Sequence, residues 1–220
     1  IQISKKRFAG IISILVLLQS FTFLSFDTIA VYENFWVLFY LVSIYTIQKK
    51  WPLSSICFFL AIFTKAFAIT YFFMNLFWIF RAAISTKKKF VLLSSYGAVV
   101  IVTLIIFQHE SSIYDDLVRI NTLEFFEGFT AWGNNMQFDP LIILCILPLT
   151  VGLYIKSRNG FVHADTILVL ILGSMLAGPF ISLITDFYFI LPYRFVPFIV
   201  FMAIGIGLFF QNKSIQNTKD

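Results

Sequence analysis

The chain has 220 residues, of which 60% are hydrophobic and only 12% are charged. A typical soluble domain carries about 25% charged residues, and a soluble chain of this length cannot bury so much apolar surface. The composition therefore excludes a soluble globular enzyme, a disordered chain and a nucleic-acid-binding domain, so no nucleic-acid partner is expected. We predict an all-α protein, a polytopic bundle of transmembrane helices in a cell membrane, in contact with membrane lipids.

Apolar segments recur along the chain. A helix needs about 20 apolar residues to cross a hydrocarbon core of about 30 Å. Segments near this length are predicted, in chain order, at 8–26, 29–47, 90–107, 141–155, 166–184 and 193–210. A further apolar stretch, 51–83, is too long for one ordinary span and short for two, and Lys65 lies near its middle.

The distribution of basic residues decides how the 51–83 stretch is interpreted. Basic clusters occur at 5–7, 49–50, 81 with 87–89, 156 with 158, and 213 with 219. If the stretch forms two short segments that turn at Lys65, every cluster falls on one side of the membrane, which the positive-inside rule assigns to the cytoplasm. The sequence therefore predicts about seven membrane segments with both termini cytoplasmic. The first short segment, 53–63, would reach only about 17 Å and must be buried by neighbours, thin the bilayer, or dip and return.

The longest connection, 108–140, is expected on the extracytoplasmic side. It carries six acidic residues against one arginine, and its aromatic residues favour order in the form of short helices at the interface. Glu110, Asp115 and Asp116 are its candidate acceptor-side residues. Together with His109 they are also candidates for binding a divalent cation, although adjacent acids in a loop are usually only solvated. The chain begins with Ile1, and we expect residues 1–220 to be a single transmembrane domain that is a fragment of a longer protein.

Four charged residues lie near the predicted outer helix ends. Lys65 and Arg194 lie on the predicted outer side, unlike the basic clusters on the cytoplasmic side, and they are suited to bind a phosphate or pyrophosphate. The alternative is that they only reach toward lipid headgroups. Asp27 precedes a predicted span, so it is either a helix N-cap or part of a polar pocket. Glu33 lies about one turn deeper and is expected to pair with Lys65 or Arg194, or to shape the same pocket.

Two segments carry a family resemblance. The segment 25–73 has an acid that opens an apolar span, a basic turn with a tryptophan, and a short span ending in Thr-Lys, which are Asp27, Lys49-Lys50-Trp51 and Thr64-Lys65. The segment 191–210 has an aromatic-Arg pair before a proline-containing apolar run, Tyr193-Arg194 and Pro197. Both resemble the GT-C superfamily of integral-membrane glycosyltransferases, which includes protein O-mannosyltransferases and the lipid A aminoarabinose transferase. The chain would match the C-terminal part of their membrane domain.

The resemblance implies transfer of a sugar from a polyprenyl-phosphate-linked donor to a polymeric or lipid acceptor at the extracytoplasmic face. Lys65, Tyr193 and Arg194 would bind the donor phosphate, and the acidic connection would help to receive the acceptor. The catalytic base of the family is an acid in the first outer loop, which would lie upstream of the matched part. The catalytic residue in this chain is therefore unknown, and no cofactor is implied.

Two other classes stay open at this point. A noncatalytic subunit or scaffold of a membrane complex has no sequence feature against it. A transporter would require paired charges at mid-span and an inverted repeat, and apart from the shallow Glu33 no deep ionisable residue is apparent.

Overall fold

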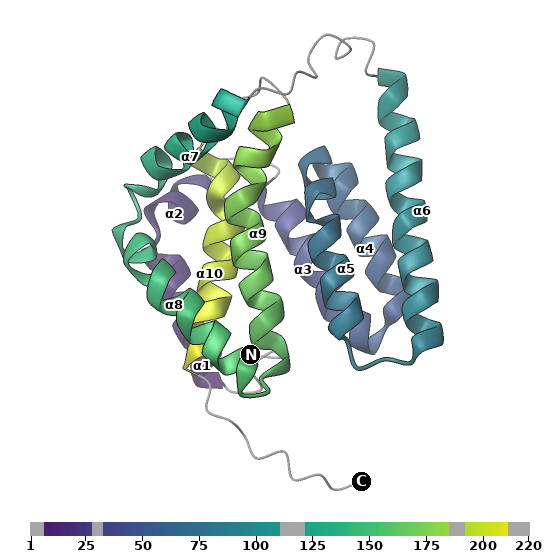
Figure 1. Cartoon of the computed structure of the whole chain (residues 1–220), viewed down its shortest axis with the longest axis horizontal. Helices are drawn as coiled ribbons and strands as arrows, with labels where there is room; N and C mark the ends of the chain where they lie inside the picture. The colour runs from purple at the N-terminus through teal and green to yellow at the C-terminus, as the bar shows by residue number, and fades with distance from the viewer. Residues whose placement is uncertain (1–6, 28–32, 111–121, 185–191, 211–220) are drawn as a thin grey trace, which may run out of the picture.

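The computed structural model describes residues 7–27, 33–110, 122–184 and 192–210, which are almost entirely helical (Figure 1). In chain order the elements are α1 (Arg7–Gln19), α2 (Phe21–Asp27), α3 (Glu33–Lys49), α4 (Trp51–Thr64), the 3-10 segment η1 (Ala66–Tyr71), α5 (Phe72–Arg81), α6 (Thr86–Glu110), α7 (Thr122–Met136), α8 (Pro140–Arg158), α9 (Val162–Ile184), the 3-10 segment η3 (Pro192–Phe195) and α10 (Val196–Phe209). These four ranges contain no β-strand. The all-α prediction is confirmed.

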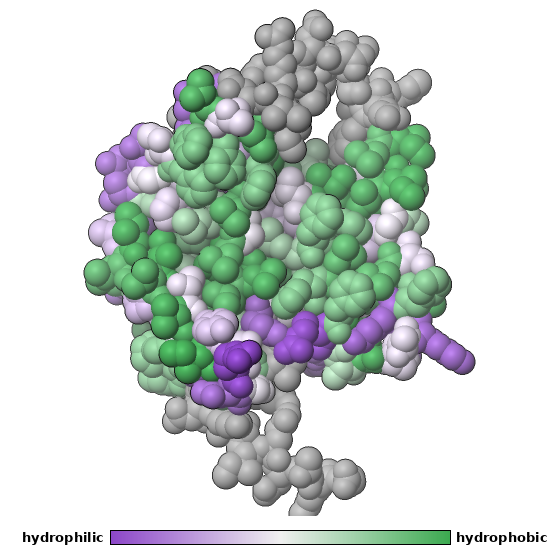
Figure 2. All heavy atoms as spheres, in the orientation of Figure 1, coloured by the Kyte–Doolittle hydropathy of each residue, from purple (hydrophilic) through white to green (hydrophobic). Residues whose placement is uncertain are grey.

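Three of the described helices are long and apolar enough to cross a membrane: Thr86–Ile106 in α6, Pro140–Arg158, which is α8, and His163–Leu183 in α9. Only 17% of the α6 and α8 windows is buried, against 50% for α9, so α6 and α8 present most of their apolar side chains outward. Figure 2 shows hydrophobic side chains over the middle of the visible face, with hydrophilic ones along its lower end and at its upper left. An outward apolar belt of this kind is suited to lipid and gives the chain the character of a membrane protein.

The helix break predicted at Lys65 is present. α4 ends at Thr64, Lys65 is extended with φ −152° and ψ 117°, and η1 starts at Ala66. α4 has 14 residues and is about 21 Å long at 1.5 Å per residue, which is shorter than a bilayer core. Pro52 lies in the first turn of α4, where the missing backbone N–H costs no hydrogen bond within the helix.

The continuous helix predicted over 8–26 is wrong, because the helix breaks at Ser20. α1 ends at Gln19 and α2 begins at Phe21. The Ser20 hydroxyl accepts a hydrogen bond of 3.0 Å from the backbone N–H of Phe23, as an N-cap serine does for the third residue of a helix. The hydroxyl supplies an acceptor for α2, so a new helix starts inside an otherwise apolar run.

The predicted 108–140 connection begins later than expected and contains a helix. α6 continues to Glu110, and α7 occupies most of the remainder, which agrees with the expected short helices. α7 packs on α9 at Gly128, where a Cβ would come within 2.7 Å of the Pro179 Cα. Asp139, at the start of α8, is buried, and its Oδ2 accepts a hydrogen bond of 3.3 Å from the Thr22 N–H in α2.

α10 is the central helix of the bundle. Twelve of its fourteen residues are buried, as expected for a helix that is apolar on all sides. It packs against α1, α8 and α9, and its Phe201 contacts Tyr40 of α3 and Tyr71 of η1 at ring-centroid distances of 5.9 Å. Helices from both ends of the chain therefore share one hydrophobic core, so residues far apart in sequence meet around α10.

Candidate functional site

The candidate site forms where α4, η1, α2 and η3 meet. Lys65 stands between α4 and η1, and its backbone N–H donates to the Ala61 carbonyl at 3.0 Å while its carbonyl accepts from the Ala68 N–H at 2.9 Å. These two hydrogen bonds close the helical segments on either side. They hold Lys65 at a fixed corner of the chain, with its side chain half-buried.

Tyr193 receives the Lys65 side chain. The Lys65 Nζ lies over the Tyr193 ring, 4.8 Å from its centroid. Within this distance an ammonium is attracted by the ring quadrupole, and the ring orients the cation without neutralising its charge. We call this pair the Lys65–Tyr193 contact. It joins two segments separated by more than a hundred residues, and both of its members are site residues predicted from the sequence.

Phe26 and Asn34 complete the surroundings of Tyr193. The Phe26 ring meets the Tyr193 ring edge to face, with centroids 5.8 Å apart and planes at 69°. The Asn34 side-chain amide donates to the Phe26 carbonyl at 3.5 Å, which ties the start of α3 to the end of α2. Neither residue was predicted from the sequence. Their only signal is that each neighbours a candidate acid, Asp27 or Glu33.

The remaining predicted site residues are placed less completely. Arg194 follows Tyr193 in the same 3-10 turn and is half-buried. Asp27 ends α2 and Glu33 begins α3, so their backbones lie beside Phe26 and Asn34, but their side chains fall outside the described part of the chain. The same holds for the Glu110 side chain at the end of α6, and Asp115 and Asp116 lie outside the described residues altogether.

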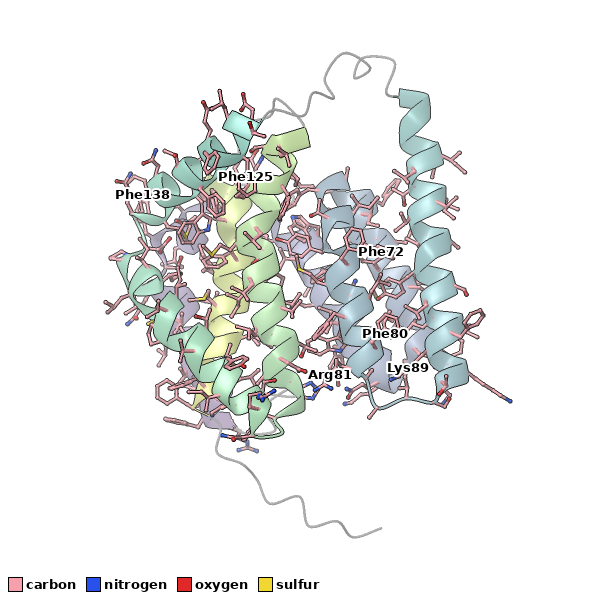
Figure 3. All side chains as sticks on the ribbon, viewed as in Figure 1. Phe72, Phe80, Arg81, Lys89, Phe125 and Phe138 are labelled. Atoms are coloured by element: carbon pink, nitrogen blue, oxygen red, sulfur yellow. The ribbon has the colours of Figure 1, made fainter. Side chains whose placement is uncertain are left out.

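Most other basic side chains of the described ranges gather at the opposite end of the bundle (Figure 3). α4, α5 and α10 each have one end near the Lys65–Tyr193 contact. The other end of α4 follows Lys50, that of α5 is Arg81, and that of α10 lies beside Lys156. Arg81 Nε pairs with Asp165 Oδ2 at 2.6 Å, and the Lys89 ammonium donates to the Phe80 carbonyl at 2.7 Å. Within the described ranges, the bundle therefore has one end with many basic side chains and an opposite end whose basic residues are Lys65 and Arg194.

The predicted divalent-cation site remains a prediction. Among the described residues, no three His, Cys, Asp or Glu side chains are grouped so that they could hold a metal ion. Asp115 and Asp116, on which the prediction depends, lie outside that set. The two cysteines are free thiols, with Cys57 buried and Cys145 half-buried.

The chemistry available at the Lys65–Tyr193 contact is recognition of an anion. A lysine ammonium is a compact point charge with three donors, and an arginine offers a planar fork that fits two phosphate oxygens. Both residue types occur here at one rim of an apolar bundle. Comparison with protein-family models, with curated proteins and with solved structures finds no match to this chain.

Proposed function

We propose that this chain binds the phosphate of a polyprenyl-phosphate-linked sugar at the Lys65–Tyr193 contact, and that it is the donor-binding part of an integral-membrane glycosyltransferase. The enzyme transfers the sugar to a polymeric or lipid acceptor at the extracytoplasmic face. Lys65 and Arg194 bind the phosphate and stabilise the charge that the lipid phosphate gains as it leaves. Tyr193 positions Lys65.

The proposal includes an orientation in the membrane. The chain crosses with about seven segments, and its basic end with both termini faces the cytoplasm. Accumulation of Lys and Arg at one end of the helices supports this orientation through the positive-inside rule. Lys65 and Tyr193 then lie at the extracytoplasmic rim, where a lipid-linked donor presents its phosphate at the boundary between headgroups and hydrocarbon.

The observation that carries the proposal is the 4.8 Å separation between the Lys65 ammonium and the Tyr193 ring. A lysine close to an apolar membrane segment is costly unless it is paired or functional. Here the cation is held on an aromatic face at a break between helices, next to a turn that also carries Arg194. An isoprenoid chain can lie along the apolar outer surface of the helices below this point.

Binding of farnesyl phosphate, a short polyprenyl phosphate, to the detergent-solubilised chain tests the proposal. Lys65→Gln should weaken binding about tenfold, because a charged hydrogen bond to the phosphate is lost. Lys88→Gln removes the same charge from an exposed position on α6 and should have no effect. Farnesol, which lacks the phosphate, should bind wild type and Lys65→Gln equally.

A second pair of variants separates the aromatic ring from the hydroxyl. Tyr193→Phe keeps the ring under Lys65 and should bind farnesyl phosphate like wild type, whereas Tyr193→Leu should lose most of the binding. Sugar transfer from a polyprenyl-phosphate sugar, measured in membranes that contain each variant, should follow the same order. Undiminished phosphate binding and transfer by Lys65→Gln and Tyr193→Leu would refute the role of this contact.

A further inference from the structure

An apolar groove lies at the basic end of the bundle. Its volume is about 510 Å³, which is within the range of roughly 300–1,000 Å³ found for small-molecule sites. Residues of α1, α3, α5, α9 and α10 line it, and they include Ile14, Val42, Tyr45, Trp78, Ile167 and Gly207. Ile14 is 53% exposed, so the groove opens to the surface of the protein.

Nearly all of the lining is hydrocarbon or aromatic. Glycine and alanine from α1 and α10 keep one wall thin, and the Trp78 indole of α5 is buried against the groove with 4% exposure. In a chain with membrane-spanning helices, a lateral apolar opening is filled from the lipid phase rather than by water, because an apolar wall offers water no hydrogen bonds.

Four basic residues from different helices lie close to residues that line the groove, two of them along the chain and two through a hydrogen bond. Arg7 lies two residues before the lining residue Ala9, and Arg81 lies one turn after Trp78. The Lys49 ammonium donates to the hydroxyl of the lining residue Tyr45 at 2.6 Å. Lys156 donates to the carbonyl of the lining residue Leu208 at 3.1 Å. Asp165 is the acid near this rim in the described ranges, and it pairs with Arg81, which leaves the rim with a clear excess of positive charge.

We infer that the groove binds one anionic glycerophospholipid, with an acyl chain among Ile14, Val42 and Trp78 and its phosphate at the Lys49 side of the rim. Apolar lining below a basic rim matches the two halves of such a lipid. A second copy of this chain fits less well, because parallel copies would bring two basic ends together and like charges repel.

This site is separate from the one proposed for the sugar donor. Residues 193 and 207 are joined by η3 and α10, which at 1.5 Å per residue sets the groove roughly 20 Å from the Lys65–Tyr193 contact. The lipid site depends on the membrane character of the chain and on its basic end, and it does not depend on sugar transfer.

Native mass spectrometry of the detergent-solubilised chain tests the inference with two lipids of identical acyl chains, phosphatidylglycerol and phosphatidylcholine. Wild type should retain one phosphatidylglycerol, bound about fivefold more tightly than phosphatidylcholine, since a basic residue near a membrane surface favours anionic lipid by about that factor. Lys49→Gln should remove the preference, and Lys88→Gln should keep it.

Matched substitutions on α1 test the groove itself. Ile14→Trp fills the opening and should lose most of both lipids, while Ile11→Trp, at a residue of 52% exposure that does not line the groove, should retain them. Val42→Phe, from the facing wall, should behave like Ile14→Trp. Equal lipid retention by Ile14→Trp, Val42→Phe and Ile11→Trp would overturn the lipid site, as would a dimer that only the groove variants lose. An unchanged phosphatidylglycerol preference in Lys49→Gln would overturn the placement of the phosphate.

Discussion

Gly207 of α10 lies directly against Ala9 of α1, where a Cβ on residue 207 would come within 2.5 Å of the Ala9 carbonyl oxygen and even closer to the Ser13 hydroxyl. The Ser13 hydroxyl itself donates to that carbonyl at 3.0 Å. Two helices from opposite ends of the chain therefore touch backbone to backbone, which is the role that small residues have between membrane helices. The contact also forms one wall of the apolar groove.

Gly207→Ala should destabilise the protein. The added methyl group meets backbone atoms of α1 that cannot rotate away, so α1 and α10 must separate, and overpacking of this kind costs about 1–3 kcal/mol. The free energy of unfolding in lipid bicelles, measured by steric trapping, gives the change directly.

Gly97→Ala on α6 is the matched control, because a Cβ at that position would have no atom within 4 Å apart from its chain neighbours and the nearby backbone of its own helix. It should leave stability unchanged or raise it slightly, since alanine is the better helix former. Equal effects of the two substitutions would show that α1 and α10 do not approach as closely as described.

Tyr96→Phe should destabilise the α3–α4–α6 part of the bundle. The Tyr96 hydroxyl lies 2.8 Å from the Ser43 hydroxyl and 2.7 Å from the Ser54 hydroxyl, and all three residues are fully buried. Hydrogen bonds between membrane helices contribute about 0.6 kcal/mol on average and up to about 1.7 kcal/mol, so a loss in that range is expected. Unfolding free energies of the single variants and of the Tyr96→Phe/Ser54→Ala double variant measure the coupling.

Tyr40→Phe provides the comparison for this test. Tyr40 is also fully buried, but its hydroxyl has no hydrogen-bond partner among the residues that the structure describes. Removing an unsatisfied buried hydroxyl should be neutral or stabilising. A larger loss for Tyr40→Phe than for Tyr96→Phe would contradict the described hydrogen bonding.

Cysteine labelling tests the proposed orientation. In a background with Cys57→Ala and Cys145→Ala, single cysteines are introduced at four exposed positions, Ala66, Lys88, Asn134 and Asn159. A membrane-impermeant maleimide applied to intact cells should label Ala66→Cys and Asn134→Cys only, because those positions lie toward the end that we assign to the outside. Labelling of Lys88→Cys or Asn159→Cys before the cells are opened would reject the orientation with about seven spans.

Some elements of the fold were predictable from the sequence. The α8–α9 turn is one case in hindsight: Gly160 has φ 86°, and the Gly160 and Phe161 N–H groups donate to the Ser157 and Lys156 carbonyls, which is the hydrogen-bond pattern of a glycine-terminated helix. The break at Lys65 was predictable for another reason, namely the side of the membrane to which each basic cluster must belong.

Other elements were not predictable from composition. Ser20 lies inside an apolar run of spanning length, and one serine does not usually end a helix. The break at Ser20 is accompanied by a tertiary contact, because the α2 N-terminus also receives the Asp139 carboxylate from a segment more than a hundred residues away. The bounds of α7 were not predictable either, because α7 packs against Pro179 of α9, and that contact exists only in the folded protein.

The amino-acid sequence alone determined that this chain is helical, that it contains long apolar segments and that its basic residues are clustered. Those properties follow from side-chain chemistry and spacing. Only the tertiary structure decided that Lys65 reaches the Tyr193 ring and that Lys49 and Lys156 each donate a hydrogen bond to a residue that lines the same groove. Such relationships depend on which helices pack together, and apolar helices with little amphipathic pattern do not specify their neighbours until close packing around α10 selects them.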